Sequence, residues 1–244
     1  MKTSRPLVTL YMVVAGPIYE RYSRVLLDDA RERFLPGRCE LVVLPGLRRP
    51  AGRESPPLWS HISATRYQMA VEHQEILRGE YVFQIDADMR IVADVGEEIL
   101  CDGITTSIHP GVATDLDPAR WPYERNPLSA ACVPYGEEGP QYHPGCFIGG
   151  KRDVFFDLAA EISTRVSRDL AAGIFPAWYE ESHLNRLFVD QPATLVLPRE
   201  YCWWAHWTPM PGVTDTYEQA RLWAAAGAKL VHLDKTGEEF EARG

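Results

Sequence analysis

Two aspartates that follow an apolar run are the first residues of this sequence that could do chemistry. Asp86 and Asp88 come directly after Tyr81–Ile85, whose β-branched and aromatic residues predict a buried strand. Residues i and i+2 of an extended chain point the same way, so both carboxylates can reach one ion. Oxygen ligands of this kind suit Mg²⁺ or Mn²⁺, which commonly also hold phosphates. The pair predicts a metal–diphosphate site. Two solvated turn carboxylates are the alternative, because a D-x-D arises about once by chance in such a chain.

A second pair of acids lies at the start of a predicted helix. Glu180 and Glu181 precede Leu184, Leu187 and Phe188, which are spaced as on one helical face. Carboxylates in a first helical turn are favoured by the helix dipole, so capping is one interpretation. The other interpretation is a carboxylate that points into a cleft.

Two further stretches could contact a ligand. Gly149 and Gly150 precede a predicted helix, where glycine lets a ligand approach the backbone closely, although a simple strand-to-helix turn is the alternative. Trp203, Trp204 and Trp207 lie on a predicted loop. Their rings could belong to the core or could stack on sugars and bases.

Alternating strands and helices must position these residues. The pattern predicts an α/β protein with a parallel sheet, in which ligands bind beyond the carboxyl ends of the strands. We expect strands at Leu7–Val14, Leu41–Leu44, Tyr81–Ile85, Ile104–Ile108, Leu128–Val133, Cys146–Ile148, Ala193–Leu197 and Leu230–Leu233. We expect helices from about Tyr19, across 62–77, at Lys151–Ala172, around Leu184 and at Tyr217–Ala228. The Arg-containing segment 46–57 is a predicted loop that could contact phosphate.

Composition excludes several classes of protein. The chain has 244 residues, 45% of them hydrophobic, which is ample for a core, and its formal net charge is -9. The chain has no run of five like charges, and its net charge is negative, which argues against a general nucleic-acid or anionic-membrane binder. The five cysteines are scattered and odd in number, which indicates reduced thiols in a cytosol. The apolar stretch near the N-terminus is too short to span a membrane, so we expect a soluble protein without a membrane anchor.

Four segments in the same order as in a known family carry a resemblance. They are LWSHISATR at 58–66, IDADM at 85–89, WPYERNPLSAACVPYGE at 121–137 with FIGG at 147–150, and AWYEESHLN at 177–185 with LPREYCW at 197–203. The chain resembles glycosyltransferase family 6, which includes the histo-blood-group A and B transferases and the α-1,3-galactosyltransferases. The match runs from about Val8 to Trp204. Within this family, the chain is similar to the soluble, bacterial-type members, and we expect it to be cytoplasmic.

The resemblance implies a GT-A fold: one domain over 1–244 with a Rossmann-like, mostly parallel sheet flanked by helices. The nucleotide would lie mainly in 1–100, the donor sugar and acceptor in 101–210, and 211–244 would form a tail. It also implies retaining transfer of galactose or N-acetylgalactosamine from UDP to a galactoside 3-hydroxyl of an oligosaccharide or glycoside acceptor.

The resemblance assigns roles to individual residues. Asp86 and Asp88 would hold Mn²⁺, or Mg²⁺, on the diphosphate, and Glu181 would be the nucleophile or the stabilising carboxylate. The implied donor-binding residues are Val13, Val14, Ala15, Trp59, Arg66, Asp86, Ala87, Gly145, Cys146, Tyr179 and Glu180. The implied acceptor-binding residues are His109, Tyr123, Trp178, Glu181 and Trp203. An unperturbed glutamate titrates near ~4.3, so we expect Glu181 to be ionised at neutral pH.

The sequence also departs from the family pattern. Pro144 and Cys146 match neither common donor-pocket pattern, and the tail beyond Trp204 shows no clear match, with Lys229 and Lys235 as stand-ins for the family's basic residues. The first alternative is therefore a transferase of the same fold with another nucleotide-sugar or a small-molecule acceptor. The others are a non-catalytic sugar-nucleotide-binding protein and a metal-dependent hydrolase.

Overall fold

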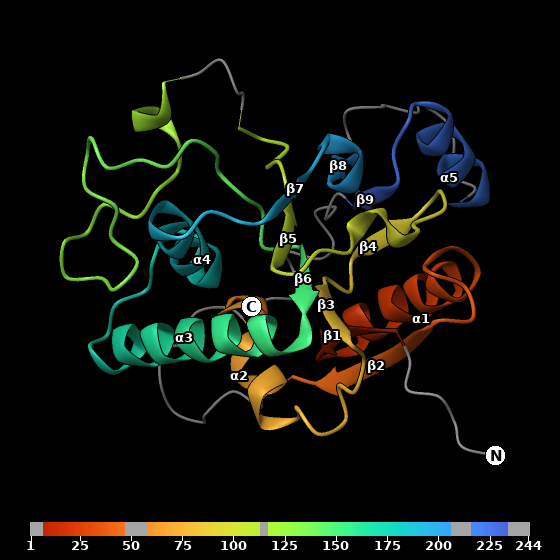
Figure 1. The fold of residues 1–244 in the computed structure, drawn as a ribbon, viewed down its shortest axis with the longest axis horizontal. Coiled ribbons are helices and arrows are strands. Elements are labelled where there is room, and N and C mark those ends of the chain that lie inside the picture. Colours follow the sequence, from red (N-terminus) through yellow and green to blue (C-terminus); the bar gives the residue numbers. More distant parts are fainter. Residues whose placement is uncertain (1–6, 47–57, 113–116, 206–215, 234–244) are drawn as a thin grey trace.

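A six-stranded sheet with the order β2-β1-β3-β6-β5-β7 forms the centre of the protein (Figure 1). The computed structural model describes residues 7–46, 58–112, 117–205 and 216–233. β6 is antiparallel to both β3 and β5, and the other strand pairs of this sheet are parallel. The predicted α/β class with a mostly parallel sheet is confirmed. The strands are β1 (Val8–Val14), β2 (Cys39–Pro45), β3 (Tyr81–Ile85), β5 (Ile104–Ser107), β6 (Phe147–Lys151) and β7 (Leu195–Leu197).

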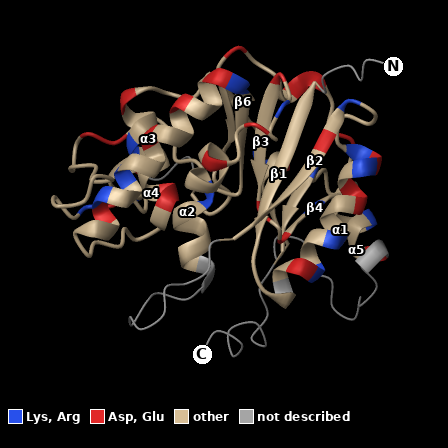
Figure 2. Ribbon diagram, turned by 90° about the horizontal axis from the view of Figure 1, so that it is seen from below, with Lys and Arg blue, Asp and Glu red and all other residues tan. Residues whose placement is uncertain are grey.

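Helices cover both faces of this sheet (Figure 2). Side chains alternate between the faces of a strand, and β1 shows this directly. Val8, Leu10 and Met12 pack into one core together with residues of α1, whereas Tyr11 packs into the other core with residues of α2, α3 and α4. The helices are α1 (Pro17–Arg33), α2 (Leu58–Glu72), α3 (Arg152–Ala171) and α4 (Tyr179–Asp190).

A second, three-stranded sheet has the order β4-β9-β8 and lies beside α5 (Figure 1). It contains β4 (Met89–Ile91), β8 (Trp203–Trp204) and β9 (Leu230–His232), and α5 spans Thr216–Ala225. β4 follows β3 after the turn at residues 86–88, so this sheet adjoins the carboxyl end of β3. Short 3₁₀ helices occur at Glu97–Ile99, Pro118–Arg120 and Arg199–Tyr201.

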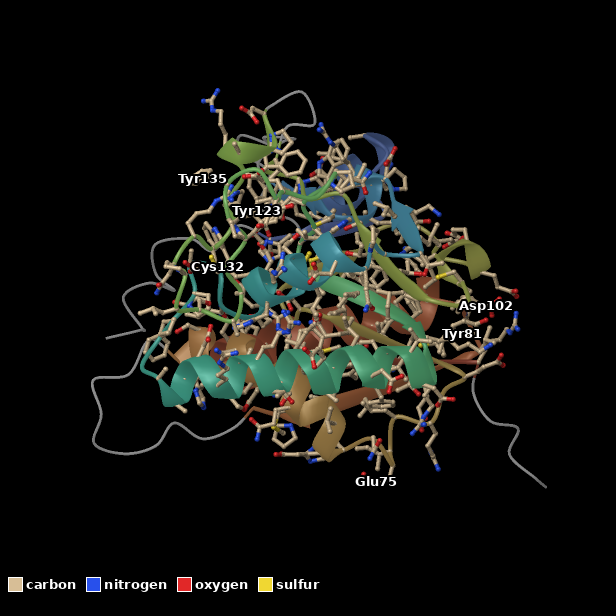
Figure 3. The ribbon with its side chains drawn as sticks, turned by 60° about the vertical axis from the view of Figure 1, so that its left-hand side comes forward. Glu75, Tyr81, Asp102, Tyr123, Cys132 and Tyr135 are labelled. Atoms are coloured by element: carbon tan, nitrogen blue, oxygen red, sulfur yellow. The ribbon has the colours of Figure 1, made fainter. Side chains whose placement is uncertain are left out.

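The predicted strand at Leu128–Val133 is wrong. Its backbone forms turns that are held by Asp169 on α3, which accepts hydrogen bonds from Ser129 Oγ at 2.5 Å and from Ala130 N at 2.8 Å. The bond from Ala130 N satisfies a backbone group that a strand would pair with a neighbouring strand. Figure 3 shows Cys132 in this irregular region.

Two predicted turns or loops belong to strands instead. Gly149 and Gly150 lie inside β6, and Trp203 and Trp204 form β8. A Cβ atom on Gly149 would lie 2.3 Å from the ring of Phe83 on β3, so the glycine allows two strands to pack closely rather than a ligand to approach.

Some expectations fall on parts of the chain that the structure does not describe. These are the basic loop at 47–57, Trp207 and Lys235. Across the described helices, none combines the length and the apolar character that crossing a membrane requires. The division of the chain into nucleotide, sugar and tail regions stays a prediction.

Candidate active site

The turn after β3 is fixed by hydrogen bonds from two distant parts of the chain. Asp86 N donates to Cys146 O at 2.9 Å, and Leu233 N donates to Asp88 O at 3.0 Å. The strand therefore ends at Ile85, and both aspartates lie in a turn rather than on a continuing strand. They still come together, because Asp86, Asp88 and His232 have ligand atoms within 4.8 Å of one another.

The donor set of this group fits a divalent cation. Asp86 Oδ1 accepts hydrogen bonds from Arg66 Nη1 and from Gln84 Nε2, which leaves Oδ2 for an ion. Asp88 is buried, with 2% of its side chain exposed, and His232 Nε2 lies 3.7 Å from its Oδ1. Two carboxylates and an imidazole are ligands that Mn²⁺ and related ions accept. The two aspartates were predicted from the sequence, whereas His232 was not.

Arg66 on α2 connects the aspartate turn to the acids of α4. It forms ion pairs with Asp86 and, at 2.8 Å, with Glu180, and it donates to Gly145 O at 2.9 Å. Although burial disfavours its charge, the two carboxylates raise the pKa of the Arg66 guanidinium above its ordinary value. Arg66 is therefore a fixed positive charge between three segments of the chain.

Glu181 is held by the backbone of the segment that precedes β6. Its Oε2 accepts a hydrogen bond from Gly145 N at 2.8 Å, and its Oε1 lies 3.9 Å from His109 Nε2. Tyr179, at the start of α4, has a φ of 48°. This left-handed conformation is strained for a bulky residue, and such strain occurs often at functional sites.

Burial changes the protonation of the acids and of the neighbouring imidazole. Burial raises the pKa of Glu180 to about 7, although Arg66 opposes the shift. It raises the pKa of Glu181 to about 8, although the Gly145 N–H opposes it. Burial also lowers the pKa of His109 to about 4, so this imidazole is neutral at pH 7. The expectation that Glu181 ionises as an ordinary glutamate therefore does not hold for the free protein.

Two adjoining cavities collect most of the predicted residues. A cavity of about 350 Å³ is lined by Arg66, Asp86, His109, Gly145, Cys146, Trp178, Tyr179, Glu180 and Glu181. A smaller one of about 40 Å³ is lined by Val13, Arg66, Asp86, Ala87 and Asp88. Arg66 and Asp86 line both cavities, so the space beside the aspartate turn adjoins the space beside the acids of α4.

Four of the predicted residues lie elsewhere. Val14 is buried in the core at the end of β1, and Ala15 follows it in the connection to α1. Tyr123 packs against Trp121 and Tyr142, its hydroxyl accepts a hydrogen bond from Gly139 N, and it is not among the residues that line the cavity. Trp203 packs on the core beside α5. The side chain of Trp59 lies outside the described residues.

Three more residues line the cavity: Trp204, whose ring the sequence suggested could stack on a sugar, and Cys202 and His232, which sequence reasoning missed. Trp204 lines the larger cavity, and since successive residues of a strand face opposite ways, its neighbour Trp203 does not. Cys202 lines it too, with its Sγ 3.0 Å from Cys146 Sγ. His232 completes the set. Lys229, which was expected to replace a basic residue of the family's tail, instead forms an ion pair with Glu98 Oε1 at 2.7 Å.

Comparison with known proteins agrees with this arrangement. The family model of glycosyltransferase family 6 matches residues 53–219, which include the aspartate turn and α4. The chain belongs to glycosyltransferase family 6. This membership agrees with the resemblance that the four sequence segments carry.

Curated members of family 6 are similar to the chain over most of its length. It is 31% identical to the dog globoside alpha-1,3-N-acetylgalactosaminyltransferase 1 over 76% of this chain and 58% of that protein. It is 28% identical to the rat histo-blood group ABO system transferase 2 over 78% of this chain and 62% of that protein. It is 27% identical to the human alpha-1,3-galactosyltransferase 2 over 92% and 69%, respectively. The chain spans about half the length of the dog, chicken and mouse globoside alpha-1,3-N-acetylgalactosaminyltransferases 1.

Proposed function

We propose that this protein is a retaining, metal-dependent glycosyltransferase. It moves galactose or N-acetylgalactosamine from a UDP-sugar to a hydroxyl of a glycan or glycoside, and the names of its relatives favour an α-1,3 linkage. One observation carries the proposal. Asp86 and Glu181 face the same cavity and are connected through Arg66 and the Gly145 peptide group.

The residues around the smaller cavity suit the nucleotide end of the donor. Asp86 and Asp88 would hold Mn²⁺, or Mg²⁺, which when bound stabilises the negative charge of a leaving diphosphate. Arg66 adds a buried positive charge and keeps Asp86 Oδ1 occupied, so the carboxylate has one orientation. Val13 and Ala87 line the same cavity and present apolar surface to the base or ribose.

The residues around the larger cavity suit the transferred sugar and the acceptor. The Gly145 N–H orients Glu181 through Oε2, and the side chain lines the cavity in which the sugar's anomeric carbon would lie. There the ionised form of Glu181 either attacks or stabilises the oxocarbenium-like carbon, as in retaining glycoside hydrolysis, so the bound donor and cation must lower its pKa from about 8 in the free protein. Trp178 and Trp204 line the cavity, and their rings can stack on an acceptor sugar. His109 is neutral at pH 7, and because its Nδ1 accepts a hydrogen bond from Gly111 N, its Nε2–H can donate one to an acceptor hydroxyl.

UDP release from a panel of UDP-sugars, with and without galactoside acceptors, tests the proposal. We expect acceptor-dependent release with UDP-galactose or UDP-N-acetylgalactosamine in the presence of Mn²⁺. Release without any acceptor would indicate a hydrolase, and tight UDP binding without release would indicate a binding protein. Either result would refute the transferase proposal.

Glu181→Gln is the informative variant for the mechanism. Removing one electrostatic stabiliser costs about 10²–10³ in rate, so we expect at least that loss of turnover with UDP binding retained. Glu161→Gln, on the half-exposed surface of α3, is the matched control and should turn over normally. Normal turnover by Glu181→Gln would contradict the assigned role.

A further inference from the structure

The pairing of two strands brings a histidine from near the end of the chain to the aspartate turn. β9 is antiparallel to β4, with His232 opposite Met89. The next residue, Leu233, donates its N–H to Asp88 O at 3.0 Å. The backbone around His232 is therefore paired with Met89 and bonded, through Leu233, to Asp88. The fold thus holds the imidazole near Asp88.

The distance between the two side chains is that of two ligands on one ion. His232 Nε2 lies 3.7 Å from Asp88 Oδ1, which is longer than a hydrogen bond. Metal–nitrogen and metal–oxygen bonds of about 2.1 Å place adjacent ligands of an octahedral ion about 3.0 Å apart and opposite ones about 4.2 Å apart. The observed separation lies between these values. Within the described part of the chain, the ring of His232 makes no hydrogen bond that would compete with a metal.

The exposure of the group also fits a cation that must enter from solvent. The Asp88 side chain is 2% exposed, whereas that of His232 is 26% exposed and lines the larger cavity. Asp88 therefore forms the closed side of the site, and His232 forms the side that is open to the larger cavity. A nitrogen ligand is less suited to Mg²⁺, which prefers oxygen, than to a first-row transition ion.

We propose that His232 Nε2 is the third protein ligand of the cation held by Asp86 and Asp88, and that it makes the site prefer Mn²⁺ over Mg²⁺. The inference rests on the proposed function only for the roles of Asp86 and Asp88. It assigns β9 a direct part in metal binding.

Pulsed electron paramagnetic resonance on the full chain with Mn²⁺ alone tests this assignment without turnover. We expect a ¹⁴N coupling to the bound ion in the wild type that is lost in His232→Gln. The coupling should remain in His109→Gln, which removes the other cavity histidine that lies close to His232, and in His73→Gln at the end of α2. Bound Mn²⁺ without nitrogen coupling in the wild type would overturn the proposal, while UDP release could continue and leave the transferase function standing.

Metal affinity provides a second measurement. We expect His232→Gln to weaken Mn²⁺ binding by at least about tenfold, with little change for Mg²⁺. His232→Asp supplies oxygen instead of nitrogen, so it should bind Mg²⁺ more tightly than the wild type does and show no ¹⁴N coupling. Circular dichroism identifies any variant that fails to fold. An unchanged ratio of Mn²⁺ to Mg²⁺ affinity in folded His232→Gln and His232→Asp would contradict the proposal.

Discussion

The buried carboxylate of Glu181 should make the free protein less stable as the pH rises. Its side chain is 17% exposed, and burial raises its pKa from an ordinary 4.5 to about 8. Glu181→Gln keeps the size of the side chain and an oxygen for the Gly145 N–H, but it cannot ionise. The substitution therefore isolates the cost of charging this position.

The sign and size of the effect follow from linkage. Between the unfolded and folded pKa values the folded state holds a proton that the unfolded state has lost, so the free energy of unfolding falls as pH rises. The loss begins near the ordinary value of 4.5 and is complete above about 8. Each pKa unit corresponds to about 1.4 kcal/mol, so Glu181→Gln should exceed the wild type in stability by about 3 kcal/mol at pH 7.

Urea unfolding at a series of pH values, with a chelator and without nucleotide, measures the difference. The wild type and Glu181→Gln should agree near pH 4 and separate steadily up to pH 8. Some slope remains in the variant because Glu180 also has a raised pKa, of about 7. The half-exposed control Glu161→Gln should follow the wild type. Parallel curves for the wild type and Glu181→Gln would refute the reasoning, because they would mean that Glu181 ionises as freely in the folded state as in the unfolded state.

Two further predictions concern the walls of the cavity. Arg66→Met should lower the free energy of unfolding by about 3–5 kcal/mol in urea titrations, because it leaves the buried Glu180 and the half-buried Asp86 without their cation. Arg31→Met, in an exposed ion pair, should change it by less than about 1 kcal/mol. Diamide should take two hydrogen atoms from the adjacent thiols of Cys146 and Cys202 and close a disulfide, detected by peptide mass mapping and absent in Cys202→Ser. The reaction should be faster at high pH, since the contact between the thiols and burial raise the pKa of Cys146, and a failure to cross-link under alkaline oxidation would contradict this geometry.

The strand before the aspartates and the position of the α4 acids could be predicted from the neighbouring residues in the sequence. Tyr81–Ile85 is a strand with the expected bounds, because an apolar β-prone run ends at a polar turn that contains the two aspartates. The acids of α4 were found for a similar reason, since they precede a clear helical face. The family resemblance then added Arg66 and His109, which no spacing in the sequence relates to the aspartates.

The remaining features depend on contacts between distant segments. The reversed direction of β6 depends on its pairing with β3 and β5, and a short apolar run is compatible with either direction. His232 reaches Asp88 only because β9 pairs with β4, and a lone histidine at the end of a three-residue strand carries no sequence signal of that pairing. The ionisation of Glu181 likewise depends on burial by several segments rather than on its neighbours in sequence.

The small β4-β9-β8 sheet has a consequence for synthesis of the protein. Its β4 emerges from the ribosome well before β9. A nascent chain can therefore form the first strands of the large sheet while His232, the third residue of the group with Asp86 and Asp88, is still untranslated. A premature stop codon after α5 would release a product that retains the two aspartates but lacks the imidazole that joins them. Such a truncated product would also lack the central strand of the small sheet and the buried Leu230, so weaker manganese binding should be accompanied by a lower free energy of unfolding.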